Sequence, residues 1–114
     1  MNTVRINISK EIGSPSALTR EQGKIIYDKI NNYIENDTFV ILDFIEIESL
    51  ITPFLNVSIG KLYEKYTSEI IKKYINIINI PEGKASSFNL VIENAKKYYS
   101  NKDSFNKAVR DVID

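Results

Sequence analysis

The chain has 114 residues, of which 43% are hydrophobic and 26% are charged, a composition that is typical of one folded domain. Its 15 Lys and Arg residues balance its 15 Asp and Glu residues, which argues against nucleic-acid binding because phosphate recognition needs a surplus of clustered basic charge. The sequence has no Cys and no His, which excludes disulfide bonds, thiolate catalysis, Cys/His zinc sites and catalysis by an imidazole base.

The first ten residues are predicted to form a half-buried strand, because apolar and polar residues alternate there. A break at residues 13–16 separates this strand from a helix that should run from Thr19 to about Asn36. Thr19 and Gln22 have the spacing of a capping box at the start of that helix. Its apolar stripe consists of Ile26, Ile30, Tyr33 and Ile34.

The segment at residues 38–44 is nearly continuous in apolar and β-branched residues. Strands of this kind are covered on both faces, as in the middle of a sheet flanked by helices. We expect residues 45–49 to form the loop that leaves the sheet. A second helix should begin at Thr52 and Pro53 and carry apolar residues as far as Tyr66, because Thr can cap free amides and Pro is tolerated at the first helical position.

A third strand is predicted at residues 74–80, and a helix should follow from about residue 86 to residue 99. Residues 101–103 are expected to form a short break before a last amphipathic helix at residues 104–113. The predicted element order is therefore β-α-β-α-β-α-α. This order indicates a single small α/β domain whose mixed or parallel sheet packs against helices.

The sequence also bears on the cellular location. No apolar run approaches the roughly 18 residues expected of a membrane span, and the first residues lack a cationic start followed by an apolar core. We therefore expect a cytoplasmic protein without membrane contact. A high content of Ile, Asn and Lys with little Arg favours a bacterial or phage source.

Three segments resemble a known family. Residues 40–44 are Val-Ile-Leu-Asp-Phe and residues 59–63 are Ile-Gly-Lys-Leu-Tyr; both look like motifs of the STAS-like domain family, an uncharacterised group related to bacterial anti-sigma factor antagonists. The Gly-Lys-Ile-Ile segment at residues 23–26 also resembles this group. The resemblance covers about residues 3–100 and implies one STAS-like domain over residues 1–114, with the last helix added to its core.

In antagonists of this kind, the loop after the central strand presents a Ser or Thr at a helix N-terminus. A partner kinase phosphorylates that residue, and phosphorylation releases a bound regulator. The family pattern Asp-Ser-Ser/Thr-Gly-Leu corresponds here to Ile-Thr-Pro-Phe-Leu at residues 51–55. The usual acceptor position falls on Pro53, so Thr52 is the remaining candidate for phosphorylation. The competing interpretation is that Thr52 only caps the helix.

The resemblance implies a non-catalytic regulatory module without a cofactor. Its partner would be a protein, either an ATP-binding kinase-like protein or an anti-sigma regulator. We expect this partner to bind the surface around residues 45–60. The residues that we assign to this surface are Glu46, Glu48, Ser49, Thr52, Leu55 and Asn56.

Two alternatives stay open. Asp43, Glu46 and Glu48 crowd the end of the central strand, where α/β sheets usually bind their ligands. Together with Thr52, these residues could form the site of a small nucleotide-binding or Mg²⁺-binding enzyme, because oxygen ligands suit Mg²⁺. However, no phosphate-binding loop accompanies them. We therefore expect an acidic rim rather than a metal or catalytic site.

The other alternative is a homodimeric structural subunit that docks through residues 104–113.

Overall fold

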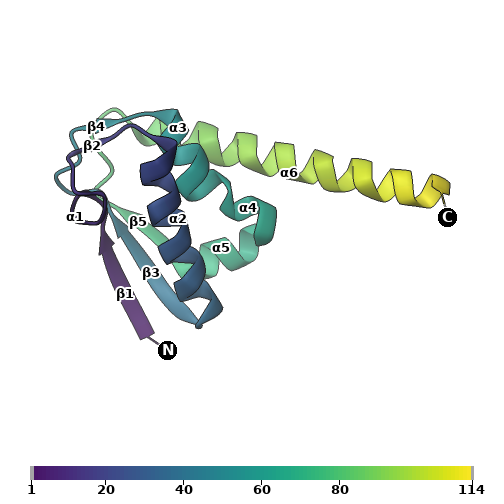
Figure 1. Cartoon of the computed structure of the whole chain (residues 1–114), viewed down its shortest axis with the longest axis horizontal. Helices are drawn as coiled ribbons and strands as arrows, with labels where there is room; N and C mark the ends of the chain where they lie inside the picture. The colour runs from purple at the N-terminus through teal and green to yellow at the C-terminus, as the bar shows by residue number, and fades with distance from the viewer. Residues whose placement is uncertain (1, 114) are drawn as a thin grey trace.

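The computed structural model describes the backbone of residues 2–113 and the side chains of residues 2–100. The strands are β1 (Asn2–Asn7), β2 (Ser16–Ala17), β3 (Thr38–Asp43), β4 (Ser49–Leu50) and β5 (Ile75–Ile78). The helices are α1 (Ile8–Ile12), α2 (Arg20–Glu35), α3 (Thr52–Leu55), the π-helix η1 (Asn56–Gly60), α4 (Leu62–Lys65), α5 (Ser68–Tyr74) and α6 (Ala85–Ile113). The predicted α/β class is confirmed (Figure 1).

The main sheet is parallel and has the strand order β1-β3-β5. Asn7 at the end of β1 lies opposite Asp43 at the end of β3, and Asp43 lies opposite Ile78 of β5. The carboxyl ends of all three strands therefore meet at one edge of the sheet. A separate two-stranded parallel ribbon, β2 with β4, lies beyond this edge.

The two faces of the main sheet differ in burial. Val40 and Leu42 of β3 are fully buried and belong to the core, which α2 covers. Ile41 lies between them and points to the opposite face, since side chains alternate along a strand. Although β3 is the central strand, Ile41 is only half-buried. The main sheet is therefore covered well on one face alone.

Helix α2 forms as the sequence predicts. The backbone amide of Gln22 donates to the Thr19 hydroxyl at 3.0 Å, and the Thr19 amide donates to the Gln22 side chain at 3.0 Å. This capping box is confirmed. The residues that α2 buries are Gly23, Ile26, Ile30 and Ile34.

The helix predicted from Thr52 differs from the observed one in two ways. Thr52 is not the N-cap: that position is taken by Ile51, which offers no side-chain hydrogen bond, so the predicted capping role of Thr52 is wrong. After Leu55 the helix widens into η1, where the Lys61 amide donates to the Asn56 carbonyl at 2.9 Å. The buried Ser58 hydroxyl donates to the Phe54 carbonyl at 2.8 Å.

Two glycines bring helices close to η1. A Cβ atom on Gly23 of α2 would lie 2.8 Å from the Phe54 carbonyl oxygen and 3.0 Å from the Val57 Cβ. Gly60 of η1 faces Val91 of α6, where an added Cβ would meet the Val91 Cγ1 at 3.4 Å. The π-helix is thus packed between α2 and α6.

The segment after η1 contains a helix that the sequence analysis did not separate. The chain is extended at Tyr66, and Thr67 then caps α5 by accepting a hydrogen bond from the Ile70 amide at 3.3 Å. Strand β5 is correspondingly shorter than the predicted strand at residues 74–80.

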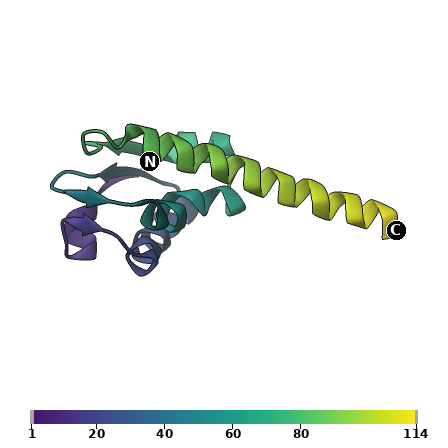
Figure 2. The ribbon, with the colours of Figure 1, turned by 90° about the horizontal axis from the view of Figure 1, so that it is seen from above.

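Helix α6 is continuous, so the predicted break at residues 101–103 is wrong. That segment, Asn-Lys-Asp, contains no Gly or Pro that would interrupt a helix. The first half of α6 buries Phe88 and Val91 against the domain, and the second half extends past the rest of the chain (Figure 2). The predicted last helix at residues 104–113 is part of α6, and its side chains lie outside the described residues. None of the helices within residues 2–113 combines the length and apolarity needed to cross a membrane.

Candidate functional site

Asp43 is the central polar residue at the carboxyl edge of the sheet, and its side chain is 0% exposed. One carboxylate oxygen accepts hydrogen bonds from Asn79 Nδ2 at 2.8 Å and from the Ile45 amide at 3.0 Å. The other accepts from Arg5 Nε at 2.7 Å and from a terminal guanidinium nitrogen of the same side chain. Asp43 thereby joins β1, β3 and the end of β5.

The pKa of Asp43 reflects these contacts. Burial alone would raise the pKa of this carboxyl group. Hydrogen bonds from Asn79, Arg5 and the Ile45 amide, together with the positive charge of Arg5, outweigh burial and lower the pKa below its ordinary value. Asp43 is therefore ionised at neutral pH and engaged within the protein, which suits a structural role rather than that of a general base.

Glu46 and Glu48 lie close to Asp43 in the sequence, but their side chains do not form a metal or catalytic site with it. Both side chains are exposed, and Glu46 adopts a positive φ of 68° in the turn that follows β3. Among the described residues, no three acidic side chains are placed so that they could hold a metal ion together. The geometry therefore gives no support to the Mg²⁺ alternative.

The β2–β4 ribbon presents two apolar side chains side by side. The Ile51 amide donates to the Ala17 carbonyl at 3.2 Å, which places Leu18 and Ile51 at matching positions just after the paired residues Ala17 and Leu50. Ala17 and Leu50 point inward and are buried, whereas Leu18 is 41% exposed and Ile51 is 43% exposed.

Acidic and hydroxyl side chains flank these two residues. Glu46 and Glu48 precede β4, Ser49 is its first residue, and Thr52 follows Ile51; all four are exposed. We refer to the two apolar residues and the four polar residues that flank them as the ribbon surface: Leu18, Glu46, Glu48, Ser49, Ile51 and Thr52.

The ribbon surface contains four of the six residues predicted to bind a partner. The prediction for Leu55 is wrong: this side chain is 1% exposed, because it packs inward from α3 together with Phe54. Asn56 is exposed but lies elsewhere, at a hollow of about 220 Å³ that it shares with Tyr98 of α6. Leu18 and Ile51 were not predicted, because nothing local in the sequence predicts the pairing of β2 with β4.

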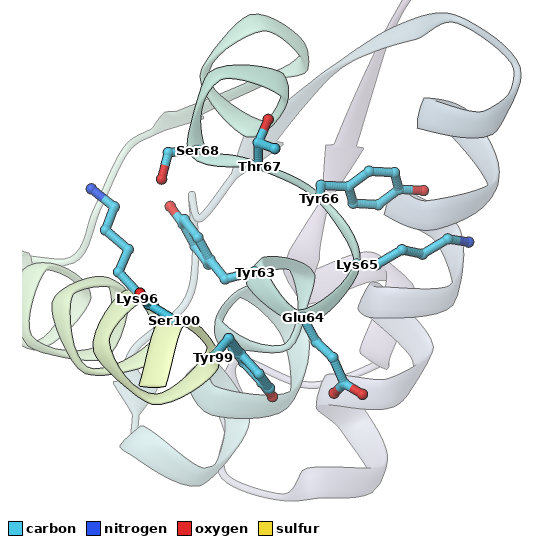
Figure 3. Close-up of a pocket in the computed structure, with 9 residues that line it drawn as sticks. All are labelled: Tyr63, Glu64, Lys65, Tyr66, Thr67, Ser68, Lys96, Tyr99 and Ser100. Atoms are coloured by element: carbon cyan, nitrogen blue, oxygen red, sulfur yellow. The ribbon is translucent and has the colours of Figure 1, made fainter. Parts of the chain in front are cut away.

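A larger hollow of about 580 Å³ lies between the α4–α5 corner and α6 (Figure 3). The Tyr63 hydroxyl, the Ser68 hydroxyl and the Lys96 ammonium group are directed toward the same side of it, whereas Tyr66 points away. The Tyr66 hydroxyl instead donates to Asn31 Oδ1 on α2 at 2.5 Å.

The chemistry of this hollow is that of a polar binding surface. Burial raises the pKa of Tyr63, and the negative charge of Glu93 raises it further, so the phenol stays protonated at neutral pH. Lys96 is paired with the same Glu93, whose carboxylate oxygen lies 3.5 Å from the Lys96 Nζ. The Tyr63 phenol is therefore a hydrogen-bond donor and not an activated nucleophile.

Comparison with known protein families identifies the chain. The model of a family described as STAS-like domain of unknown function (DUF4325) matches residues 22–84. The chain belongs to this family. The comparisons found no similar curated protein and no similar solved structure.

Within this STAS-like domain, the residues of the motifs that resemble the family stabilise the fold. Leu42 and Phe44 are buried in the core, and Asp43 between them binds Arg5 and Asn79. The glycines of the other two motifs lie where α2 and α6 approach η1. The part of the ribbon surface that follows β3 lies inside the matched region of the STAS-like domain, whereas Leu18 lies before it.

Proposed function

We propose that this STAS-like domain is a non-catalytic regulatory module that binds a protein partner through the ribbon surface in the bacterial cytoplasm. The main support is the exposure of Leu18 and Ile51 on a hydrogen-bonded ribbon. Neighbouring apolar side chains on a rigid backbone bind a partner at little cost in conformational entropy. Apolar groups with a polar rim are typical of the centre of a protein interface.

The flanking residues indicate the chemistry of the partner. Glu46 and Glu48 give the ribbon surface a negative rim, which favours a partner with an apolar pocket bordered by Lys or Arg. The family resemblance adds that such a partner is an ATP-binding kinase-like protein or an anti-sigma regulator. The bound state would then be favoured by charge complementarity as well as by burial of the two aliphatic side chains.

Thr52 gives this surface a means of regulation. Its side chain is exposed and does not cap α3, so its hydroxyl group is free of that structural role. Phosphorylation would add a charge of about −2 beside two glutamates. The added charge would strengthen binding to a basic partner surface and would oppose binding to an apolar one.

The engaged state of Asp43 argues against the enzymatic alternative. That alternative needs a carboxylate at the strand end that can bind a metal ion or accept a proton. Both oxygens of Asp43 already accept hydrogen bonds from Arg5, Asn79 and the Ile45 amide.

The proposal predicts that Leu18→Asp and Ile51→Asp each weaken partner binding. The partner to test first is the product of the adjacent gene, with affinity measured by calorimetry or surface plasmon resonance. We expect each substitution to weaken binding by about 30-fold, since anchors at the centre of an interface contribute about 2 kcal/mol or more. Both residues are exposed, so the variants should stay folded, which circular dichroism can check.

Leu90→Asp is the matched control, because Leu90 is an exposed aliphatic residue on α6, outside the ribbon surface. It should leave the affinity unchanged. Equal binding by the wild type and by the Leu18→Asp/Ile51→Asp double variant would refute the proposed surface.

A further inference from the structure

One face of the main sheet lacks the cover that parallel sheets normally have. We define the open sheet face by the residues that point to it: Thr3, Arg5, Phe39, Ile41, Asn76 and Ile78. Phe39, Ile41 and Ile78 are half-buried, and none of them belongs to the core cluster. The Phe39 ring contacts Tyr74 at the end of α5, with ring centroids 5.5 Å apart, so α5 covers only this corner of the face. The Arg5 side chain is 59% exposed and is already neutralised by Asp43.

This exposure is unusual for the type of sheet. Sheets made of parallel strands alone occur almost only where helices cover both faces, because the crossover helices between the strands pack on those faces. In this domain α2 covers the other face, where Val40 and Leu42 are fully buried. Within the part of the chain that the structure describes, no helix covers the open sheet face beyond the corner at Phe39, and the element that usually fills this place is an amphipathic helix.

The chain carries such a helix. The first half of α6 packs on the domain through residues spaced at i, i+3, i+4 and i+7, namely Phe88, Val91, Ile92 and Ala95. Tyr98, near the end of this half, is 62% exposed. The sequence then repeats the same spacing with Phe105, Ala108, Val109 and Val112.

The second apolar stripe does not continue the line of the first. At 3.6 residues per turn it is rotated by roughly 100° around the helix axis. By its sequence pattern, the second stripe is therefore expected on a different side of the helix from the first. A stripe with this spacing is wider than the two-position seam of a coiled coil, and its width suits packing on a folded surface.

We propose that the protein forms a two-fold homodimer in which residues 101–113 of α6 from each copy cover the open sheet face of the other. The helix of each copy binds the sheet of the other, so the two equivalent contacts form a closed dimer. The dimer gives each parallel sheet helices on both faces. The formal net charge of zero means that two copies do not repel each other over long distance. This inference does not rest on the proposed function.

The dimensions of the two surfaces match. Residues 101–113 span roughly 20 Å at 1.5 Å per residue, and strands of the length of β1 and β3 span roughly 20 Å. A helix about 10 Å wide would cover roughly 200 Å² of sheet. A two-fold dimer has two such contacts, and each buries area on both the helix and the sheet, which gives roughly 800 Å² of flat area. Because side chains make both surfaces uneven, the accessible area is larger and approaches the roughly 1,000 Å² that a specific interface needs. A single contact would bury only half as much.

Disulfide cross-linking tests this arrangement directly, because the chain has no Cys. Ile41→Cys and Val109→Cys chains are mixed and oxidised, and the products are identified by mass spectrometry. We expect the mixed disulfide to predominate and light scattering of the unmodified chain to give the mass of a dimer. Ile78→Cys, at the edge of the open sheet face, replaces Ile41→Cys if that variant is unstable. Leu90→Cys mixed with Ile41→Cys is the control and should give no mixed product.

The other outcomes overturn the inference. A Val109→Cys disulfide between identical chains as the main product would indicate that two α6 helices pair with each other. An Ile41→Cys disulfide between identical chains would indicate that two sheets pack face to face. A monomeric mass at all concentrations, with no mixed disulfide, would show that the open sheet face is left uncovered by a second copy.

Discussion

Replacing Gly23 with Ala is expected to lower the free energy of unfolding by roughly 2 kcal/mol, as measured by urea denaturation. Inside an exposed helix the same substitution would stabilise by about 1 kcal/mol. Here the new Cβ would lie 2.8 Å from the Phe54 carbonyl oxygen, which is backbone and cannot rotate away. Helix α2 would have to move off η1, and the close packing between them would be lost.

Gly60→Ala is the matched control for this prediction. Its Cβ would meet the Val91 Cγ1 at 3.4 Å and the Ala95 Cβ at 3.7 Å, which are tolerable distances from side-chain atoms. We expect a change of less than about 1 kcal/mol. If Gly23→Ala were as stable as the wild type, the described contact between α2 and the Phe54 carbonyl would be incorrect.

Asp43→Ala is expected to have the larger effect, with a loss of roughly 3 kcal/mol. The substitution removes the acceptor for the Asn79 amide, the Ile45 backbone amide and the Arg5 guanidinium in one step. The donor residues Arg5, Ile45 and Asn79 are exposed, so the loss comes from the charge-assisted hydrogen bonds that the carboxylate makes and not from buried donors left without a partner. Arg5→Met should cost less, about 1 kcal/mol, because Arg5 is largely exposed and Asp43 keeps its other two donors. Equal losses for the two variants would contradict the central role assigned to the carboxylate.

The same carboxylate makes stability depend on pH. The pKa of Asp43 is lower in the folded state than its ordinary value of 3.8, so Asp43 stabilises the fold fully above that value. The contribution is lost as the pH falls below about 4 toward the lowered pKa of the folded state. Urea unfolding at a series of pH values should show this loss in the wild type and a smaller one in Asp43→Asn. The pKa of Glu35 is also lowered, chiefly by a hydrogen bond from Lys65, but that pair is exposed and should add little. Parallel pH profiles for wild type and Asp43→Asn would show that Asp43 makes no such contribution.

The sequence predicts those elements whose cause is local. The capping box at Thr19 and Gln22 and the apolar run of β3 each depend on a few neighbouring residues, and both are confirmed. The π-helix depends on packing between segments that are distant in the sequence, so local patterns did not reveal it. The corner after Tyr66 did have a local signal that was not used, because Thr67 caps α5 by accepting from the Ile70 amide.

The candidate site was predicted only in part for the same reason. Leu55 and Ile51 are both aliphatic residues next to a helix start, and the sequence alone does not say which of them points inward. Pairing of Ala17 with Leu50 determines the answer, because it turns Ile51 outward beside Leu18. Leu55 is one turn further along and faces the core.

The segment at residues 49–60 links the ribbon surface to α6, the helix whose last part we propose to bind a second copy. It begins in the ribbon surface at β4, continues through α3 and ends in η1, against which α6 packs. A shift of α6 when a second copy binds would therefore be transmitted along a stiff backbone to Ile51 and Thr52. In thermodynamic terms dimerisation and partner binding would be linked, and each would change the equilibrium constant of the other by the same factor.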